Sequence, residues 1–235
     1  MTRIFRLTIL LLTAASLSVV LAEPPHRILW SWFADDDLRF INPRETGVGY
    51  LAASLHIEGR DRVLSHPRTS PVRIARGTYE IAVIHIDYHR ASFTPEQRRL
   101  VVAMIAEIAG LTRAPAVQID FDAPQSAYPF YRDLLRDLRQ RLGARIFISI
   151  TALVSWCESP HSWLSTLQVD EIVPMPFHLG RVTPFLFPGC RGSIGVSLRD
   201  APVFMLTRGQ RIYFFPGPQR WSRQSVQAAF EEVKQ

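Results

Sequence analysis

Apolar positions follow two different periodicities along the chain. Short stretches that alternate every second residue, or that are continuously apolar, indicate strands, and longer stretches with apolar residues three and four apart indicate helices. The predicted strands are residues 27–33, 48–57, 80–88, 116–124, 145–153, 172–177, 193–198 and 211–215. The predicted helices are residues 94–111, 126–142, 159–167 and 222–233.

Strands that alternate with helices indicate βαβ units and a parallel sheet. Eight strands favour one α/β domain over residues 23–235, a (β/α)8 TIM-type barrel. We expect irregularity in its first and last strands, because some neighbours there lack a full helix between them. An open doubly wound sheet is the alternative. No glycine-rich phosphate-binding turn follows any predicted strand, which argues against nucleotide binding.

The clearest helix signal lies at residues 94–111. Thr94 can cap the first turn, Pro95 suits that turn, and Gln97 completes a capping box. Gly110 is expected to end the helix.

The N-terminus has a pattern of its own. Arg3 and Arg6 precede an apolar run, which a small-x-small sequence ending at Ala22 closes. This arrangement is typical of a secretory signal peptide, so we expect residues 1–22 to be removed. The mature protein would then be periplasmic or secreted, without stable membrane insertion. An uncleaved anchor is the alternative, although the run is shorter than the roughly 20 residues that span a bilayer comfortably.

Charge and cysteine content narrow the range of partners. The formal net charge is +6, and every basic residue except Lys234 is an arginine. The arginines are scattered and no nucleic-acid motif is present, so nucleic acid is not expected as a partner. An anionic polysaccharide or envelope surface is compatible with this charge.

In an oxidising compartment Cys157 and Cys190, the only cysteines, are expected to form a disulfide. Two cysteines without a nearby histidine pair make a poor zinc site.

Two pairs of polar residues stand near the ends of predicted strands. Asp120 and Asp122 are two apart, so they project from the same face of their strand, opposite an apolar set. His85 and Asp87 share a face in the same way. Buried carboxylates need partners or a use. They could form a structural ion pair or cap the next helix, or they could form a site.

The carboxyl ends of barrel strands form the active-site face. The catalytic candidates there are Asp122, Asp120 and Asp87, and one carboxyl group could act as an acid while another stays ionised. Aromatic faces and carboxylates together suit sugars. The substrate-binding candidates are Trp30, Trp32, His85, Thr151, Trp156, Met175, Phe177, His178 and Tyr213. Plain packing is the alternative for the tryptophans, and a core histidine bonded to Asp120 or Thr151 is the alternative for His85. Asp170 and Glu171 begin a strand, so we expect structural roles, with arginine as a partner.

Several motifs carry a resemblance to known families. The run from Gln118 to Asp122 resembles the DxxDxDxE signature of family 18 glycoside hydrolases, and Met175-Pro176-Phe177 resembles their Met-x-Tyr motif. The resemblance implies a (β/α)8 barrel. Pro124, however, stands where those enzymes keep the catalytic glutamate, and proline cannot donate a proton.

A closer resemblance is to the bacterial family called domain of unknown function 3142. The residues that carry it are Leu29-Trp30-Ser31-Trp32, His85-Ile86-Asp87, Gln118 to Ala123, Ser149 to Leu153 with Ser155-Trp156-Cys157, and Asp170 to Met175. This resemblance implies a fold but no activity.

These observations predict an exported carbohydrate-active protein, a glycoside hydrolase that acts on an envelope or extracellular polysaccharide or oligosaccharide. Two alternatives stay open: a non-catalytic glycan-binding barrel that lacks the general acid, and an envelope assembly partner. No cofactor or metal is expected, although Asp87, Asp120, Asp122 and His85 could form an oxygen and nitrogen ligand set.

Overall fold

The computed structural model describes residues 23–158, 163–177, 187–190, 192–199 and 209–233. The predicted signal peptide, residues 1–22, and the candidate residue His178 lie outside these ranges. The strands are β1 (Arg27–Ser31), β2 (Asp37–Leu38), β3 (Thr46–Glu58), β4 (Arg62–Pro67), β5 (Arg73–Ile74), β6 (Glu80–His89), β7 (Ala116–Asp120), β8 (Phe147–Ala152), β9 (Glu171–Pro174), β10 (Ser193–Ser197) and β11 (Arg211–Phe215). The helices are α1 (Pro95–Thr112), α2 (Tyr128–Leu142) and α3 (Arg223–Glu232), with short 3-10 turns η1 (Gln125–Ala127), η2 (Gly143–Arg145), η3 (Val154–Trp156) and η4 (Trp163–Thr166).

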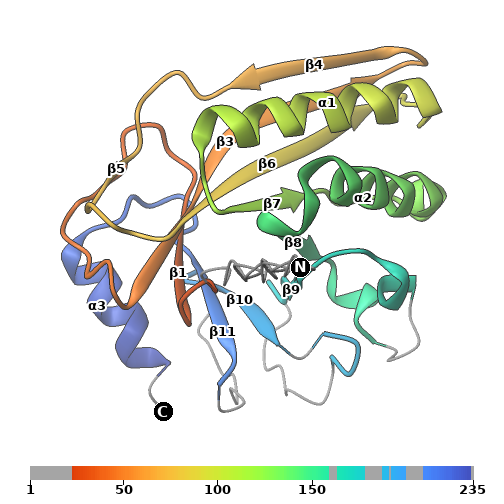
Figure 1. Ribbon diagram of the computed structural model, residues 1–235. Helices are drawn as coiled ribbons and strands as arrows, with labels where there is room; N and C mark the ends of the chain where they lie inside the picture. The colour runs from red at the N-terminus through yellow and green to blue at the C-terminus, as the bar shows by residue number, and fades with distance from the viewer. Residues whose placement is uncertain (1–22, 159–162, 178–186, 191, 200–208, 234–235) are drawn as a thin grey trace, which may run out of the picture.

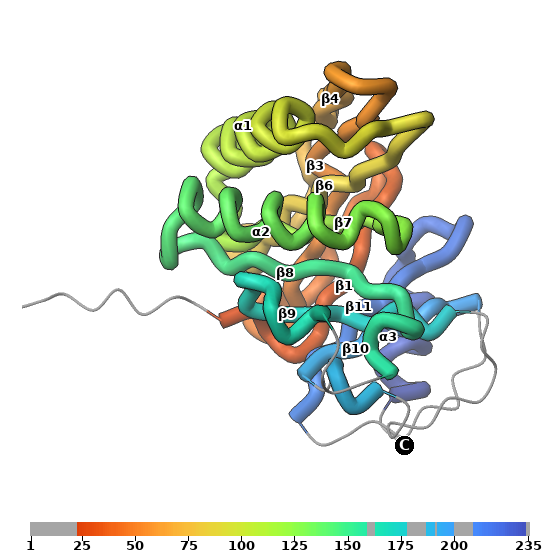
Figure 2. The backbone as a smooth tube through the Cα atoms, turned by 90° about the vertical axis from the view of Figure 1, so that its right-hand side faces the viewer, coloured from red at the N-terminus to blue at the C-terminus, as the bar shows by residue number. Residues whose placement is uncertain are grey.

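Eight parallel strands form the main sheet in the order β10-β11-β1-β3-β6-β7-β8-β9, and β4 pairs antiparallel with β3 (Figure 1). The two ends of this order, β9 and β10, lie next to each other, so the sheet curls into a nearly closed barrel. Figure 2 shows the strands stacked from β4 and β3 at the top to β10 below, with α1 and α2 along one side. The predicted barrel is therefore confirmed. Its expected irregularity is confirmed too, since β1 and β3 are each followed by small strands instead of a helix.

Side chains hold the gap between β9 and β10, since no ladder joins these two strands in the part of the chain that the structure describes. Ser193 Oγ donates to Glu171 Oε1 at 2.5 Å across this seam. Gly195 matters here because a Cβ atom at this position would lie 2.8 Å from Met175 Sδ and 3.3 Å from the Pro174 carbonyl oxygen. The absence of a side chain lets the two strand ends approach closely.

The predicted cap of α1 is confirmed, but its predicted end is wrong. Thr94 and Gln97 form the capping box, and Pro95 occupies the first turn. The helix continues through Gly110 to Thr112 and ends at Arg113, which adopts a left-handed conformation with φ of 55°. Gly110 is thus an ordinary helical residue, and Arg113 takes the left-handed position that a glycine often fills at a helix end.

The central strands divide the core into two layers. On β6, Ala82, Ile84 and Ile86 point outward, into the layer under α1 and α2. Ile81 and Val83 point into the barrel, where they pack with Trp30 and Phe215. The inward positions continue upward along the same face of β6 to His85 and Asp87, so the interior becomes polar toward the strand ends.

Candidate functional site at the barrel mouth

His85, Asp120 and Thr151 form a hydrogen-bonded unit where β6, β7 and β8 end. His85 and Asp120 are paired positions of adjacent strands, and His85 Nδ1 lies 2.9 Å from Asp120 Oδ2. Thr151 Oγ1 donates to Asp120 Oδ1 at 2.8 Å. Both oxygens of Asp120 are therefore bonded to neighbours on the two flanking strands, which fixes the carboxylate in the mouth of the barrel.

The hydrogen bond to Asp120 raises the pKa of His85, and this effect outweighs the burial that would lower it. The negative charges of Asp87 and Asp122 act on His85 in the same direction. The site thus favours an imidazolium that faces carboxylates on more than one side.

Asp122 lies two residues beyond Asp120, just past the end of β7. Burial by the surrounding protein raises the pKa of Asp122, and the charge of Asp120 raises it further. His85 opposes both effects. Asp122 is exposed to solvent, and the direction of its pKa shift is toward tighter proton binding than in an ordinary aspartate.

Asp87 is in the same region but has a different direct neighbour. Its Oδ2 lies 3.8 Å from His56 Nδ1 on β3, and its side chain is largely exposed. Asp87 acts on His85 through its charge. The structure thus places the predicted acids Asp87, Asp120 and Asp122 around one histidine.

Pro124 takes a structural position at the start of the next turn. It is the N-cap of η1, and its carbonyl oxygen accepts from Ala127 N at 2.7 Å. The residue that replaces the glutamate of the hydrolase motif thus directs the chain from β7 toward α2.

An aromatic wall completes the mouth. Trp32 is 38% exposed and stacks on Trp30, with ring centroids 5.6 Å apart. The Trp32 ring also meets His85 edge-on at 5.4 Å. Phe215 packs against both Trp30 and Phe177, at 4.6 Å and 5.1 Å. Trp32 is therefore an exposed tryptophan in direct contact with the polar unit.

The predicted substrate-binding set is only partly brought together. Met175 and Phe177 pack in the inner layer with Trp30. Trp156 is only 4% exposed and packs against Tyr128 in the outer layer, so the structure removes it from the mouth. Tyr213 is fully buried and bonds to Glu171 deep in the barrel, so it cannot meet a ligand there.

A buried polar network runs below the wall and was not expected from the sequence. Trp30 Nε1 donates to Gln118 Oε1 at 2.7 Å, and Gln118 Nε2 donates to Ser149 Oγ at 3.0 Å. Ser149 Oγ in turn donates to Glu171 Oε2 at 2.9 Å. This chain of bonds fixes the orientation of Trp30, and through it the base on which Trp32 stacks. The polar alternation of Gln118 with Asp120 was the only sequence signal for it.

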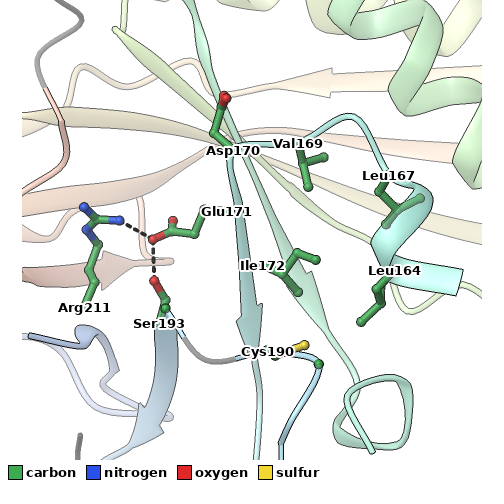
Figure 3. A pocket seen from close by; sticks show the side chains of 11 residues that line it. Leu164, Leu167, Val169, Asp170, Glu171, Ile172, Cys190, Ser193 and Arg211 are labelled. Atoms are coloured by element: carbon green, nitrogen blue, oxygen red, sulfur yellow. Dashed lines mark hydrogen bonds and ion pairs between the residues drawn. The ribbon is translucent and has the colours of Figure 1, made fainter. Parts of the chain in front are cut away.

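Glu171 joins this network to the opposite end of the barrel. Besides Ser149, its carboxylate accepts from Ser193, Tyr213 and the Arg211 guanidinium. The expected structural role with an arginine partner is confirmed for Glu171, and for Asp170, whose Oδ2 lies 2.5 Å from Arg139 Nη2. Figure 3 shows Glu171, Ser193 and Arg211 together beside a hollow of about 380 Å³ at the seam. This hollow is at the strand starts, away from the mouth.

The predicted disulfide is present. Cys157 and Cys190 are bonded, with Cα atoms 5.4 Å apart.

In the described ranges, no three histidine, cysteine or acidic side chains are grouped so that they could hold a metal ion. The helices of those ranges include none long and apolar enough to cross a membrane.

The fold and its mouth define a class. The chain is a parallel-stranded barrel of the TIM type, with carboxylates, a histidine and an exposed tryptophan at the carboxyl ends of its strands. Residues 75–178 match the family described as Domain of unknown function (DUF3142), which confirms the resemblance expected from the sequence. The matched segment contains β6 to β9, and with them His85, Asp120, Asp122 and Thr151.

Solved structures with similar folds were also found. The spore cortex-lytic enzymes SleL from Bacillus megaterium QM B1551 and Bacillus cereus are 11% and 14% identical, each with a TM-score of 0.48. Each alignment covers 75% of this chain and 51% of the other, so the chain spans about half the length of SleL. The catalytic domain of a chitinase from Pyrococcus furiosus is 11% identical with a TM-score of 0.46, over 82% of this chain and 84% of that one. A search of curated protein sequences found no match.

Proposed function

We propose that this protein is an exported glycoside hydrolase that acts on an envelope or extracellular polysaccharide. The observation that carries the proposal is Asp122, a carboxyl group of raised pKa beside the bonded pair of His85 and Asp120. A proton donor of raised pKa close to an ionised carboxylate is what glycoside hydrolysis needs.

The roles follow from the environment of each acid. Asp122 would donate its proton to the glycosidic oxygen as the bond from that oxygen to the anomeric carbon breaks. Asp120, whose two carboxylate oxygens are held by His85 and Thr151, would stabilise the positive charge that develops on the sugar. Asp87 would take a proton from the water that attacks the anomeric carbon. The products are two shorter sugar chains, and the elements of water are divided between them.

The aromatic wall supplies the binding surface for this chemistry. The exposed ring of Trp32 lies against His85, so a sugar that covers the ring would have its edge near the carboxylates. Trp30 stacks on this ring from below, and Gln118 accepts a hydrogen bond from Trp30. The ligand class that suits the mouth is therefore a saccharide with an apolar face and several hydroxyl groups.

Export is supported by the disulfide and by the pattern of the N-terminal residues. A bonded cysteine pair persists in oxidising compartments, and the apolar N-terminal run has the pattern of a cleaved leader. An extracellular or periplasmic substrate is consistent with both.

The second candidate is a barrel that binds glycans without cleaving them. Its support is Pro124, which occupies the position of the missing glutamate and serves as the N-cap of η1. In this case the carboxylates would accept hydrogen bonds from sugar hydroxyl groups, and the Asp122 proton would have no chemical role.

The release of new reducing ends from purified bacterial polysaccharides separates the two candidates. Asp122→Asn should lower the rate by roughly 10²- to 10⁴-fold, because the amide cannot donate the proton. Asp61→Asn, in the turn between β3 and β4, is the matched control and should keep full activity. No release from any polysaccharide by the unmodified protein, together with measurable binding, would establish the second candidate instead.

A further inference from the structure

The end of the barrel opposite the mouth carries exposed arginines next to an exposed leucine. Arg113 ends α1, Arg141 lies in the last turn of α2, and Arg145 closes the following turn η2. Leu111, in the last turn of α1, is 75% exposed. We call these four residues the arginine rim.

The topology brings the members of the rim together. Ala116 of β7 pairs with Phe147 of β8, and Phe147 N donates to the Pro115 carbonyl at 3.0 Å. Arg113 lies three residues before Ala116 and Arg145 lies two residues before Phe147, so both arginines precede adjacent strands on the same end of the sheet. Helices α1 and α2 pack against each other and both end there.

The three arginines of the rim form no ion pair with any residue that the structure describes. Their neighbour Arg139 differs, since it donates to the carbonyls of Gly143 and Ile146 and is paired with Asp170. Arg139 therefore fixes the turn that presents Arg141 and Arg145. Among acids on the same elements, Glu107 lies one helical turn before Leu111, and Asp133 and Asp137 are bonded to Arg98 and Arg136.

The first described residues lie at this end as well. Ile212 N donates to the His26 carbonyl at 2.8 Å. Arg211 Nη2 donates to Pro24 O at 2.8 Å, and Arg211 Nε lies 3.0 Å from Pro25 O. The chain thus enters the barrel at the strand starts, while His85 and Asp120 lie at the strand ends.

We infer that the arginine rim is a docking surface for the anionic headgroups of a lipid bilayer. Guanidinium groups pair well with phosphate, and each basic residue near an anionic membrane increases the affinity by about fivefold. The exposed Leu111, two residues before Arg113, favours a bilayer over a purely polar anionic polymer, because its side chain can enter the boundary between headgroups and acyl chains. Docked in this way, the protein would present its mouth away from the membrane.

Vesicle co-sedimentation of the chain from Glu23 onward, which contains every described residue, tests this inference. The protein should bind vesicles of phosphatidylcholine with phosphatidylglycerol and should not bind phosphatidylcholine alone. Replacement of Arg113, Arg141 and Arg145 by glutamine should weaken binding by about 100-fold. Raised salt should weaken binding of the unmodified protein as well, because exposed charges are screened.

The matched control replaces Arg60, Arg62 and Arg90 by glutamine, at the turn of the β3–β4 hairpin and after β6. It changes the net charge equally and, like the rim variant, includes one arginine of left-handed conformation, Arg90 with φ of 48°. Equal loss in both variants, equal binding to both kinds of vesicle, or no binding would overturn the inference. Tighter binding to polygalacturonate than to the anionic vesicles would also overturn it, in favour of a polymer. Circular dichroism shows whether each variant is folded.

Discussion

At the scale of single residues, the account depends on His85. Its ring joins Asp120 on the next strand and Trp32 on the aromatic wall, so it connects the acids to the binding surface. The sequence predicted that His85 and Asp87 share a face, and it offered Asp120 or Thr151 as the histidine's partner. In the structure the partner of His85 is Asp120, and Thr151 donates to the other carboxylate oxygen of Asp120. The register of β6 against β7 determines which residue lies beside His85. That register could not be deduced from the single sequence.

The raised pKa of His85 predicts a pH-dependent stability. The folded protein binds this proton more tightly than the unfolded chain does, so the stabilisation is fully present below about pH 6.5 and is lost as pH rises through the folded-state pKa. The difference in unfolding free energy between the unmodified protein and His85→Gln should therefore shrink as the pH rises above about 6.5. Urea denaturation at several pH values measures it.

His66→Gln is the control, because that ring is exposed on β4 and has no hydrogen bond to a carboxylate in the described residues. The same pH series with His66→Gln shows how much of the change belongs to His85 specifically. A His85→Gln difference that does not change with pH would show that the pairing with Asp120 adds no protonation-linked stability.

At the scale of elements, the seam between β9 and β10 is where the barrel departs from a regular sheet. Glu171 and Ser193 cross it by side chains, and the disulfide from Cys157 to Cys190 ties the segment before β10 to the turn after β8. The Gly189 amide also donates to the Cys157 carbonyl at 3.1 Å. Covalent and side-chain bonds there take the place of a backbone ladder.

Removal of the disulfide should therefore destabilise the protein. A bond that closes 33 positions restricts the unfolded chain and contributes about 3–4 kcal/mol in the chain-entropy model. The double variant Cys157→Ser and Cys190→Ser should lose about that much free energy of unfolding in urea, while the oxidised unmodified protein keeps it. A loss below about 1 kcal/mol would mean that the seam is held by Glu171 and its donors alone.

Element types were easier to predict than element ends. The strand at residues 48–57 was identified, but the structure extends β3 from Thr46 to Glu58 and pairs it with a hairpin strand, β4, which is outside the eight predicted strands. The helix ending at Arg113 was placed too short, because Gly110 is a local signal and packing is a tertiary one. The cap at Thr94 was predicted correctly, since capping is local.

At the scale of the whole molecule, the two ends of the barrel differ in their chemistry. The strand ends carry the acids, His85 and Trp32, and the strand starts carry the arginine rim and the entry of the chain. Hydrophobic alternation predicted the barrel and the end at which a site would lie. It did not separate Trp32 from Trp156, because both are tryptophans near strand ends, and only the direction of each side chain in three dimensions distinguishes the mouth from the outer layer.

The central claim is that the mouth cleaves glycans through the proton of Asp122. The most direct measurement compares binding and cleavage of one polysaccharide by the unmodified protein and by Asp122→Asn, with affinity measured by calorimetry and products by mass spectrometry. The account predicts similar affinity for both proteins and cleavage products from the unmodified protein alone. Tight binding without products from either protein, or equal amounts of product from both, would contradict it.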